Sequence, residues 1–597
     1  MNKLKFYAII SLCATLALTG CKTGTAQNNE QSNIGEQTVS SEVNSEPTET
    51  EAERIEREKK EAEEAAKFEA EKKAEERLAL ETSRKEQYKE FYVPLPALDQ
   101  EVAKKMIEAK GLYVTGSVAG YKFDESRIES YAKYVEGLKT GNQELISQNS
   151  ASNKNANLLE KAVGICLATE VNALVIDVKN DSGFMTYNSD VEATNIAKSN
   201  SKNSIRNIDA LIELLKKHDI YAIARIVTFK DPHFARTMSK HSMQSKSGGV
   251  WHDRHGIPWV NQFDEYVWNY NVAIAKEAAL KGFDEIQFDY VRFPDNARVY
   301  NKQVNYPHRN DRDKDEGIED FLEFARQELS PYGVNIAADV FGVITRNWDD
   351  KPEDIGQTWR KVANTTEYIC PMVYPSHYST GWYGFKYPDA HPYGVLEASM
   401  KEAIEKNAAQ QTPATIRPWI QGFTAGWVKG HIDYSPENIR KQILACMDLG
   451  INDYLIWDAG NTYDPRIFFY NYEKKDVKDV SLDRIERTPI DAVKKYLKAE
   501  RYDKTASLYL ITAIESRDKD YDTFASNHEK SNISISKYTV GDMTPNDKGY
   551  TVSVTYTYKA TEKNESGEDV QVNKTLENQP IQVIKENDIW KVVPISM

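Results

Sequence analysis

The chain is poor in cysteine, with five among 597 residues. Cys166 and Cys446 fall in segments with helical periodicity and Cys370 falls in a strand-like segment, and their spacing fits no metal-binding motif. We therefore expect these three side chains to be buried free thiols.

Clustered histidine is absent as well. The ten histidines are scattered, and the first strand-like segment, GLYVTGSVAG at residues 111–120, lacks the His-x-His pair of amidohydrolase-type metal barrels. His252 and His255 lie in a long loop segment without further ligand candidates beside them. We expect no metal and no cofactor. A metal-dependent deacetylase is the alternative, and bound zinc would reveal it.

Positive charge is in deficit. Lys and Arg number 76 against 91 Asp and Glu, which gives a formal net charge of -15. Proteins that bind nucleic acid neutralise phosphates with an excess of Lys and Arg, so we expect no nucleic-acid partner. A neutral or cationic ligand fits this balance better.

Long apolar runs are missing beyond the first residues. The run FYAIISLCATLAL follows Lys3 and Lys5 and is too short to span a membrane comfortably, and no second run of about 18 apolar residues occurs. The next residues, Leu18-Thr19-Gly20-Cys21, resemble the lipobox of bacterial lipoproteins. We predict a lipoprotein signal peptide over residues 1–20 and a lipid on Cys21, which would anchor the chain at the extracytoplasmic face of the bacterial cell membrane. An ordinary secretion signal is the alternative.

Two polar segments follow. Residues 21–50 are rich in Ser, Thr, Asn, Gln and Glu with almost no large apolar residues, so we expect a disordered tether. Residues 51–92 carry opposite charges four positions apart, a spacing that stabilises an exposed helix. The pairs are Glu53/Arg57, Glu56/Lys60, Glu63/Lys67 and Glu69/Lys73. Apolar residues are too sparse for a sustained heptad seam, so a solvated spacer helix is favoured over a coiled coil.

Residues 93–475 alternate between strand-like and helix-like segments. The strand-like segments begin at Gly111, Ala173, Tyr221, Glu285, Asn335, Tyr368, Thr415 and Asp453. Amphipathic segments such as SIRNIDALIELLKKH and SPENIRKQILACMDLG separate them. This alternation predicts an α/β fold, and eight parallel strands close a (β/α)8 TIM barrel. A doubly wound open sheet is the alternative, but neither G-x-G-x-x-G nor a P-loop follows the first strand.

Residues 485–597 have a different pattern. A helical segment over residues 489–510 precedes the alternating strand segments YTVSVTYTYKA and QPIQVIKENDIWKVVPIS. Helices followed by strands predict a small α+β domain. It resembles the cone-shaped, nuclear-transport-factor-like (NTF2-like) domains of many bacterial lipoproteins, and it contains no catalytic constellation.

Acidic residues gather at the predicted C-terminal ends of the barrel strands. Side chains alternate between the interior and the outside of a barrel strand, so Asp289 shares its side with Gln287. Asp177 and Asp339 likewise lie opposite the apolar residues of their strands, whereas Asp458 shares its side with apolar neighbours and is less decisive. Barrel enzymes keep their active sites at this end, although polar upper layers also occur in inert barrels.

Two carboxyl groups that flank one bond are the requirement for glycoside hydrolysis. Asp289 and Asp339 lie on adjacent predicted strands, which are about 4.8 Å apart. A neighbouring arginine favours an ionised carboxylate, and an apolar setting favours the protonated acid. We predict Asp289, near Arg292 and Arg225, as nucleophile or base and Asp339, within AADVFG, as the acid. The reverse order of roles remains open.

A wider set of residues is predicted to bind the substrate. Its members are Asp177, Arg225, Arg292, Tyr374, His377, Gln421, Asp458, Trp251 and Trp382. The aromatic members and Trp427 lie in or beside loops such as STGWYGF and FTAGWVKG, where flat apolar faces suit sugar rings, although aromatics are more often core residues.

Several motifs occur in an order that resembles a known family. The motifs are GLYVTGSVAG, NALVIDVKNDSG, IQFDYVRFP, AADVFG, MVYPSHY and IWDAGNTY. Over residues 108–472 the chain is similar to a bacterial glycoside hydrolase-like domain long catalogued as a domain of unknown function and distantly related to α-amylase-type barrels. The resemblance implies a barrel, a carbohydrate substrate and Asp289 on the nucleophile strand. The amylase pattern has Arg where this chain has Gln287 and a Glu acid where it has Asp339.

These features predict a membrane-anchored enzyme that hydrolyses a polysaccharide or oligosaccharide with two carboxylates. The alternative, from another functional class, is a non-catalytic carbohydrate-binding or cell-envelope scaffold protein with a degenerate barrel. Loss of sugar release with retained binding after Asp289→Asn would distinguish the two.

Overall fold

The computed structural model describes residues 50–98, 102, 104–346, 351–410, 413–469, 488–502, 504–518, 521–531, 535–563, 569–586 and 589–594. The chain divides into two compact units, residues 1–77 and 78–597. The predicted signal peptide, Cys21 and the tether up to residue 49 lie outside the described residues.

The charged segment forms a helix, α1, at Glu51–Tyr88, as its charge spacing predicted. Its side chains are exposed throughout residues 54–76. The predicted pair of Glu69 and Lys73 forms at 3.7 Å, whereas Arg57 and Lys67 pair with the glutamates four residues after them instead of those before. Each such exposed pair contributes only about 0.3–0.5 kcal/mol, so this part of the helix depends on many small contributions.

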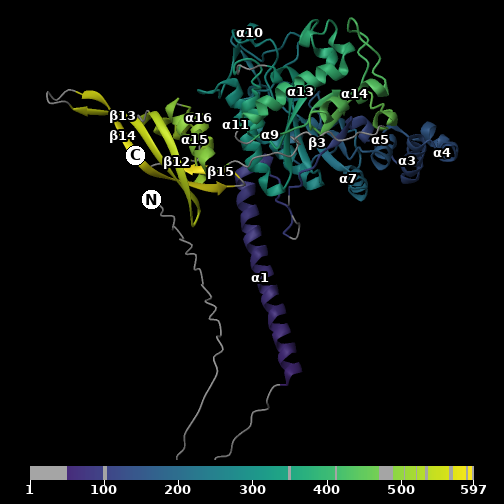
Figure 1. The fold of residues 1–597 in the computed structure, drawn as a ribbon. Coiled ribbons are helices and arrows are strands. Elements are labelled where there is room, and N and C mark those ends of the chain that lie inside the picture. Colours follow the sequence, from purple (N-terminus) through teal and green to yellow (C-terminus); the bar gives the residue numbers. More distant parts are fainter. Residues whose placement is uncertain are drawn as a thin grey trace, which may run out of the picture. The chain divides into compact units, whose positions relative to one another are not determined.

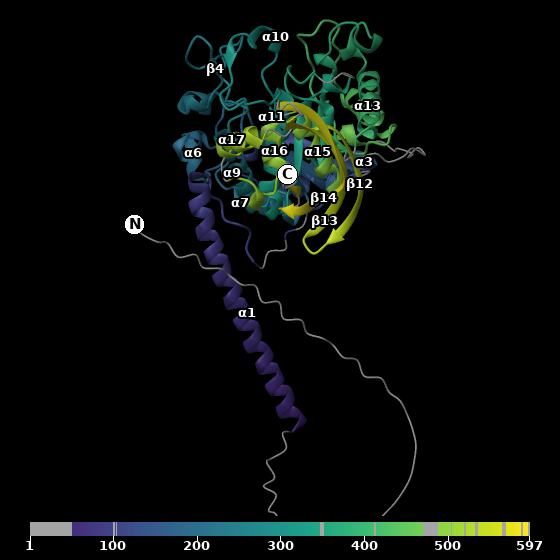
Figure 2. The ribbon, with the colours of Figure 1, turned by 90° about the vertical axis from the view of Figure 1, so that its left-hand side faces the viewer.

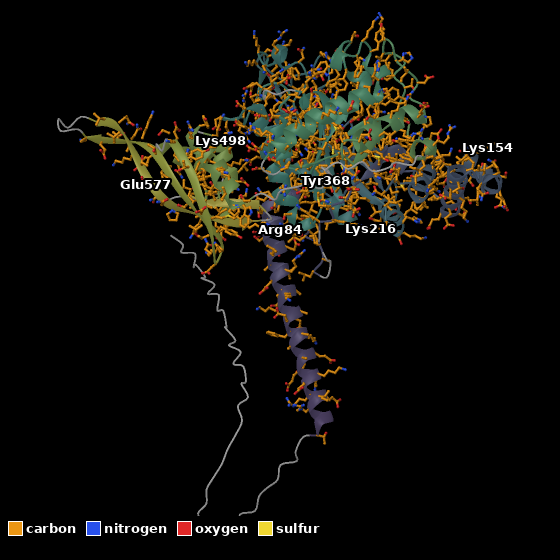
Figure 3. All side chains as sticks on the ribbon, viewed as in Figure 1. Arg84, Lys154, Lys216, Tyr368, Lys498 and Glu577 are labelled. Atoms are coloured by element: carbon orange, nitrogen blue, oxygen red, sulfur yellow. The ribbon has the colours of Figure 1, made fainter. Side chains whose placement is uncertain are left out.

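Within the second unit, the last turns of α1 pack on the barrel. The hydroxyl of Tyr88 donates to Glu328 Oε2 at 2.8 Å, and Lys276 Nζ lies 4.3 Å from the centre of the Tyr88 ring. Arg84, labelled in Figure 3, donates to the hydroxyl of Tyr332 at 3.3 Å. These contacts fix residues 78–88 against the barrel.

The barrel strands follow the predicted order along the chain (Figure 1). They are β1 at Lys110–Val114, β2 at Ala173–Lys179, β3 at Tyr221–Val227, β5 at Glu285–Asp289, β7 at Asn335–Phe341, β8 at Tyr368–Val373, β9 at Thr415–Ile416 with β10 at Trp419–Gln421, and β11 at Tyr454–Trp457. Each strand pairs in parallel with its neighbours, and the pairing of β10 with β8 and β11 closes the sheet. The α/β barrel prediction is confirmed.

The seventh strand position is split in two. Thr415 and Ile416 pair with β8, and pairing resumes at Trp419. Pro418 stands between the two pieces and has no N–H to donate to a neighbouring strand. The interruption therefore falls where the backbone cannot continue the ladder.

Helices connect the strands and cover the barrel (Figure 1). They are α2 at Gly116–Ala119, α3 at Glu125–Thr140, α4 at Gln143–Asn155, α5 at Leu158–Ala168, α6 at Glu192–Ile196, α7 at Ile208–Lys217, α8 at Pro232–Thr237, α9 at Glu265–Lys281, α10 at Ala297–Tyr300, α11 at Lys314–Leu329, α12 at Trp359–Ala363, α13 at Pro392–Ala408 and α14 at Pro436–Met447. Cys370 and Cys446 are buried free thiols as predicted, and Cys166 is a half-buried one.

Local sequence sets the ends of these helices. Asp264 caps the start of α9 by accepting the Tyr266 N–H at 2.9 Å. Gly282 ends the same helix at φ 104°, a conformation that a residue with a Cβ atom rarely adopts. Ser435 and Pro436 provide the side-chain cap and the first residue of α14.

Two long loops at the C-terminal ends of β3 and β5 form a small structure of their own. They carry β4 at Gln244–Ser245 and β6 at Val304–Asn305, which pair antiparallel, and α10 lies beside them at the top of Figure 2. Trp251, Trp259, Tyr300 and other apolar residues form a separate buried cluster here.

The N-terminal end of the barrel interior holds a buried ionic layer. Arg417 Nη1 lies 2.7 Å from Glu285 Oε1, and its Nε lies 3.2 Å from Asp453 Oδ1. The guanidinium carbon lies 3.5 Å from the centre of the Tyr368 ring. Burial raises the pKa of Asp453 to about 7 against the lowering effect of Arg417. This end of the barrel is occupied by structural contacts.

The C-terminal residues form a small α+β domain that is mostly sheet. Its helices are α15 at Pro489–Arg501, α16 at Thr505–Ile511 and α17 at Tyr521–Ser531. Its strands are β12 at Ile535–Asn546, β13 at Gly549–Lys563, β14 at Asp569–Glu586 and β15 at Ile589–Val593, antiparallel in that order. In the described parts of the chain, no helix combines the length and apolarity needed to cross a membrane.

Candidate active site

Asp289 is the last residue of β5, at the C-terminal end of the barrel. Its Oδ2 accepts from Arg225 Nε at 2.9 Å and from Arg225 Nη2 at 2.5 Å, and its Oδ1 accepts the Tyr290 N–H at 2.5 Å. The residue is only 5% exposed. Two of the three donors around this buried carboxyl group belong to one guanidinium, so Asp289 forms a charge-assisted ion pair with Arg225.

Arg225 connects three acids from two parts of the chain, the end of β2 and the end of β5. Its Nη1 lies 2.7 Å from Asp177 Oδ1. Its Nη2 lies 3.2 Å from Asp181 Oδ1 and 2.5 Å from Asp289 Oδ2. Burial opposes the charge of this guanidinium, but the three carboxylates raise its pKa well above the usual range. Asp177 also accepts from the Tyr113 hydroxyl at 2.7 Å, and burial raises the pKa of Asp177 despite Arg225.

Asp339 on β7 has a different environment. Its Oδ1 accepts from Gln287 Nε2 at 2.5 Å and from Trp419 Nε1 at 2.7 Å, and the residue is 1% exposed. Burial and then repulsion from Asp289 raise the pKa of Asp339 well above its usual value, and the two donors and Arg225 only partly oppose this. Both hydrogen bonds reach Oδ1, so Oδ2 is the oxygen suited to carry a proton.

The two acids are neighbours across the β5–β7 ladder. Phe288 pairs with Ala338, so Asp289 and Asp339 are the next pair along strands about 4.8 Å apart. The hydroxyl of Tyr374, at the end of β8, lies in the field of both carboxyls, which together with burial raises its pKa well above 10. The site thus joins an ion-paired carboxyl group to a neighbouring acid whose pKa is raised by burial and repulsion.

Arg225, not Arg292, forms the ion pair with Asp289. Arg225 lies beside Gln287 in the β3–β5 register. Arg225 therefore supplies the guanidinium beside Asp289 from the neighbouring strand, while Gln287 of β5 donates to Asp339. Arg292 instead donates from Nη1 to the Phe293 carbonyl at 2.8 Å.

Three aromatic residues that the sequence analysis did not assign to the site line the barrel interior here. The rings of Tyr113 and Trp457 stack at 4.0 Å, and Arg225 lies 5.6 Å and 5.2 Å from their centres. Trp419 lies 5.6 Å from Trp457. The same alternation that selected the acids places these residues inside, since Trp419 is two residues from Gln421. Asp181 follows β2 in a loop, where no periodic signal marks it.

Aromatic rings lead from the acids toward the surface; we call Tyr374, His377, Phe423 and Trp427 the aromatic row. Ring centres are separated by 5.3 Å for Tyr374–His377, 6.1 Å for Tyr374–Phe423 and 6.1 Å for Phe423–Trp427. Tyr374 is 8% exposed and Trp427 is 76% exposed. The predicted residues Tyr374 and His377 therefore lie together, and Phe423 extends them to solvent.

Gln421 and Asp458 contact loop backbone. Gln421 is buried, accepts the Ser376 N–H at 3.0 Å and donates to Asp389 Oδ1 at 3.1 Å, so it braces the loops that carry the aromatic row. Asp458 accepts the N–H groups of Gly460 and Thr462 at 3.0 and 2.8 Å. Their binding of substrate stays a prediction.

The two predicted tryptophans lie in other clusters. Trp251 is 7% exposed and packs on Tyr300 at 5.0 Å within the β4–β6 loop cluster. Trp382 lies near Tyr378 and Tyr383, with Arg346 5.3 Å above its ring. Within the described residues no hydrogen bond or ring contact joins either indole to Asp289 or Asp339, and their role in binding stays a prediction.

The described residues contain no cluster of potential metal ligands. No group of three or more His, Cys, Asp or Glu residues there has the geometry to hold an ion. The acids around Arg225 are instead arranged about a guanidinium.

A family model described as "Putative glycosyl hydrolase domain" matches residues 145–463. No curated protein matches the chain. Among solved structures, a hypothetical protein from Ruminiclostridium thermocellum is 31% identical, over 38% of this chain and 97% of that one, with a TM-score of 0.29.

Two solved glycosidases are also similar at low identity. An α-galactosidase from Thermus thermophilus is 9% identical over 62% of this chain and 60% of its own, with a TM-score of 0.34. An exo-β-N-acetylglucosaminidase from Vibrio harveyi is 10% identical over 71% of this chain and 57% of its own, with a TM-score of 0.32. This chain spans less than two-thirds of the length of either glycosidase.

Proposed function

Because this chain belongs to the family described as "Putative glycosyl hydrolase domain", we propose that it hydrolyses a glycosidic bond of a polysaccharide or oligosaccharide with Asp289 and Asp339. The observation that carries the proposal is the contrast between these two neighbouring groups. Arg225 donates two hydrogen bonds to Asp289, while burial and repulsion from Asp289 raise the pKa of Asp339 and so favour its protonated form. Glycoside hydrolysis requires this pairing of an ionised and a protonated carboxyl group.

In the proposed reaction, Asp339 donates its proton to the glycosidic oxygen as the bond to the anomeric carbon breaks. In a retaining enzyme the Asp289 carboxylate attacks that carbon, and water later hydrolyses the resulting ester with Asp339 as base. In an inverting enzyme Asp289 takes a proton from the attacking water instead. The anomer of the first product, observed by NMR, distinguishes these two courses.

Tyr374 and the rest of the aromatic row support a sugar as the ligand. Their rings offer apolar faces between the acids and Trp427 at the surface. A chain of sugar rings laid along them would bring one linkage to the acids.

The test is digestion of a broad glycan panel by the wild type and Asp289→Asn side by side, with sugar release and binding both measured. The proposal expects release by the wild type, a loss of at least about 10³-fold in the variant, and retained binding. Asp190→Asn is the matched control, because Asp190 is exposed in the loop after β2 and its N–H donates to Glu277. Wild-type protein that releases nothing from any glycan would refute the enzymatic proposal.

A second candidate function is binding without turnover. Asp339 is 1% exposed and Asp289 5% exposed, so these groups offer little surface to a substrate in the present arrangement of loops. A carbohydrate-binding or cell-envelope scaffold protein would show saturable glycan binding by the wild type without release, and the same affinity in Asp339→Asn.

We also propose that Cys21 carries the lipid that anchors the protein at the extracytoplasmic face of the cell membrane. The support is the lipobox-like Leu18-Thr19-Gly20-Cys21 after a short apolar run. Metabolic labelling with a fatty-acid analogue should mark the wild type and not Cys21→Ala. Label retained in the variant would exclude this anchor.

A further inference from the structure

Arg292, in the loop after β5, differs from the other buried arginines of the described chain. Four of them lie within 4.0 Å of a carboxylate: Arg225, Arg312, Arg326 and Arg417. Arg292 is 7% exposed, and among the described residues its guanidinium has one hydrogen bond, from Nη1 to the Phe293 carbonyl. No carboxylate of a described residue lies within ion-pair distance of it. Burying a guanidinium without a counter-ion costs free energy of folding, which suggests that the charge of Arg292 has a function.

Aromatic rings hold this guanidinium near the C-terminal ends of β5 and β7. It lies 4.2 Å from the Phe341 ring, 5.0 Å from Tyr290 and 5.2 Å from Trp259. Phe341 is two residues beyond Asp339 and therefore on the same side of β7. Burial lowers the pKa of Arg292, and the Asp289 charge is among the groups that oppose this shift, which places Arg292 within electrostatic reach of the site.

Lys230 provides a second cation at the same place. It lies half-buried in the loop after β3, with Nζ 3.2 Å from the Tyr290 hydroxyl and 4.4 Å from the ring centre. Among the residues that the structure describes, no carboxylate pairs with it. Cation–ring contacts position both side chains but leave their charges without a counter-ion.

Tyr290 connects the two cations to Asp289. Its N–H donates to Asp289 Oδ1 at 2.5 Å, and its ring contacts both Lys230 and Arg292. Its φ is 49°, in the left-handed region that a tyrosine adopts at a cost in free energy. This conformation places the ring at the junction of the nucleophile and the two cations.

We infer that Arg292 and Lys230 form a subsite for an anionic substituent of the sugar substrate, a carboxylate, a sulfate or a phosphate ester. The inference rests on the proposed function and names its substrate class. A guanidinium binds such groups through paired N–H donors, and an ammonium adds a point charge. Whole-chain charge predicts a neutral or cationic ligand, but binding depends on the charges at the site, where neither cation forms an ion pair with a carboxylate of a described residue.

The test uses matched polysaccharide pairs with the full chain: uronate polymers against their carboxyl-reduced forms, and sulfated or phosphorylated glycans against the same glycans without the ester. Binding is measured in the Asp289→Asn background and hydrolysis in the wild type. For at least one pair we expect the anionic form to bind about tenfold tighter, with the preference weakening as salt rises. The pair that shows the preference identifies the anion.

Three variants and one control assign the preference to the subsite. Arg292→Gln and Lys230→Gln should each reduce it several-fold, while Arg292→Lys retains part of it and Lys154→Gln, on the exposed side of α4 (Figure 3), leaves it unchanged. Thermal unfolding checks the folding of Arg292→Gln, and Lys230→Gln tests the subsite from a half-buried position.

Three negative outcomes are distinguishable. Equal or tighter binding of the neutral forms, with hydrolysis of either, would overturn the anionic subsite and leave the proposed function standing. Absence of both binding and hydrolysis across all pairs would remove the proposed function and the subsite together. An anionic preference that survives both Gln variants would place the recognition elsewhere and also refute the inference.

Discussion

The indole Nε1 of Trp419 donates a hydrogen bond to Oδ1 of Asp339 at 2.7 Å. The two residues lie on β10 and β7, which are separated in the barrel by β8. The contact reaches across the interior and touches the group that the proposed reaction uses as its acid. The packing of Trp419 in the barrel therefore affects the protonation of Asp339.

Replacing this donor should move the pH dependence of hydrolysis. The Trp419 hydrogen bond stabilises the ionised form and lowers the pKa of Asp339 against burial and repulsion from Asp289. Trp419→Phe removes it, so the pKa rises, Asp339 stays protonated to higher pH, and the alkaline limb of the kcat profile moves upward by about one pH unit, equivalent to about 1.4 kcal/mol.

Trp359→Phe is the control for this shift. Trp359 is equally buried, and its indole donates to Asn407 Oδ1 at 3.2 Å, outside the barrel interior. The Trp359→Phe variant should be less stable than the wild type, but the pH profile of its kcat should be unchanged. An alkaline limb that stays in place, or moves to lower pH, in Trp419→Phe would contradict Asp339 as the acid.

The roles of the two acids can be separated by the leaving group. Asp339→Asn should lose about 10²- to 10⁴-fold in kcat on natural linkages but much less on aryl glycosides whose leaving group needs no proton. Asp289→Asn should lose activity on both, because the attacking group or base is gone. Steady-state kinetics on matched aryl and alkyl glycosides measures the difference, and the opposite pattern would exchange the two roles.

The buried layer at the other end of the barrel should affect stability and not chemistry. Burial raises the pKa of Asp453 to about 7, above its value in an unfolded chain of about 3.9. Between these values the folded protein binds a proton that the unfolded chain does not. The contribution of Asp453 to the free energy of unfolding is therefore largest below about pH 4. It declines by up to about 1.4 kcal/mol per pH unit until about pH 7.

Asp453→Asn tests this pH dependence. Asp453 Oδ2 is buried without a hydrogen-bond partner in the described structure, while Oδ1 accepts the Ala109 N–H at 2.9 Å. The amide cannot titrate, so the free energy of unfolding by urea should fall less steeply between pH 4 and pH 7 than in the wild type. Parallel curves for the two proteins would show that Asp453 titrates normally.

The exposed end of the aromatic row should contribute to affinity alone. Trp427 is 76% exposed and stacks on Phe423 at 6.1 Å, so Trp427→Ala removes a surface ring without opening the core. We expect KM or Kd for an oligosaccharide to rise about 3- to 10-fold, equivalent to about 1 kcal/mol for one stacked ring, with kcat and Tm nearly unchanged.

Tyr121→Ala is a matched loss of an exposed ring near the start of α3, 45% exposed, and should leave affinity unchanged. Titration calorimetry with oligosaccharides of increasing length measures both variants. Unchanged affinity in Trp427→Ala at every length would exclude this residue from the binding surface.

The alternation of side chains was enough to predict where the acids lie. In a barrel strand every second residue faces the interior, so the sequence around Asp289 and Asp339 predicts that both side chains point inward. Parallel strands bring their C-terminal ends together, which predicts that the two acids are close. The order of the strands and the charged helix follow from equally local patterns of apolar and charged residues. These predictions needed no knowledge of which strands meet across the barrel.

Only the closed barrel decided which partners the acids have. The sequence placed Arg292 three residues after Asp289, yet Arg225 from β3 forms the ion pair, and Trp419 reaches Asp339 past an intervening strand. Loop packing likewise buried Trp251 in a cluster of its own. Such contacts depend on the stagger of the strands and on how loops of different lengths fold over their ends. The stagger of the strands and the packing of the loops are determined by residues far apart in the chain, so a local periodic pattern cannot predict these contacts.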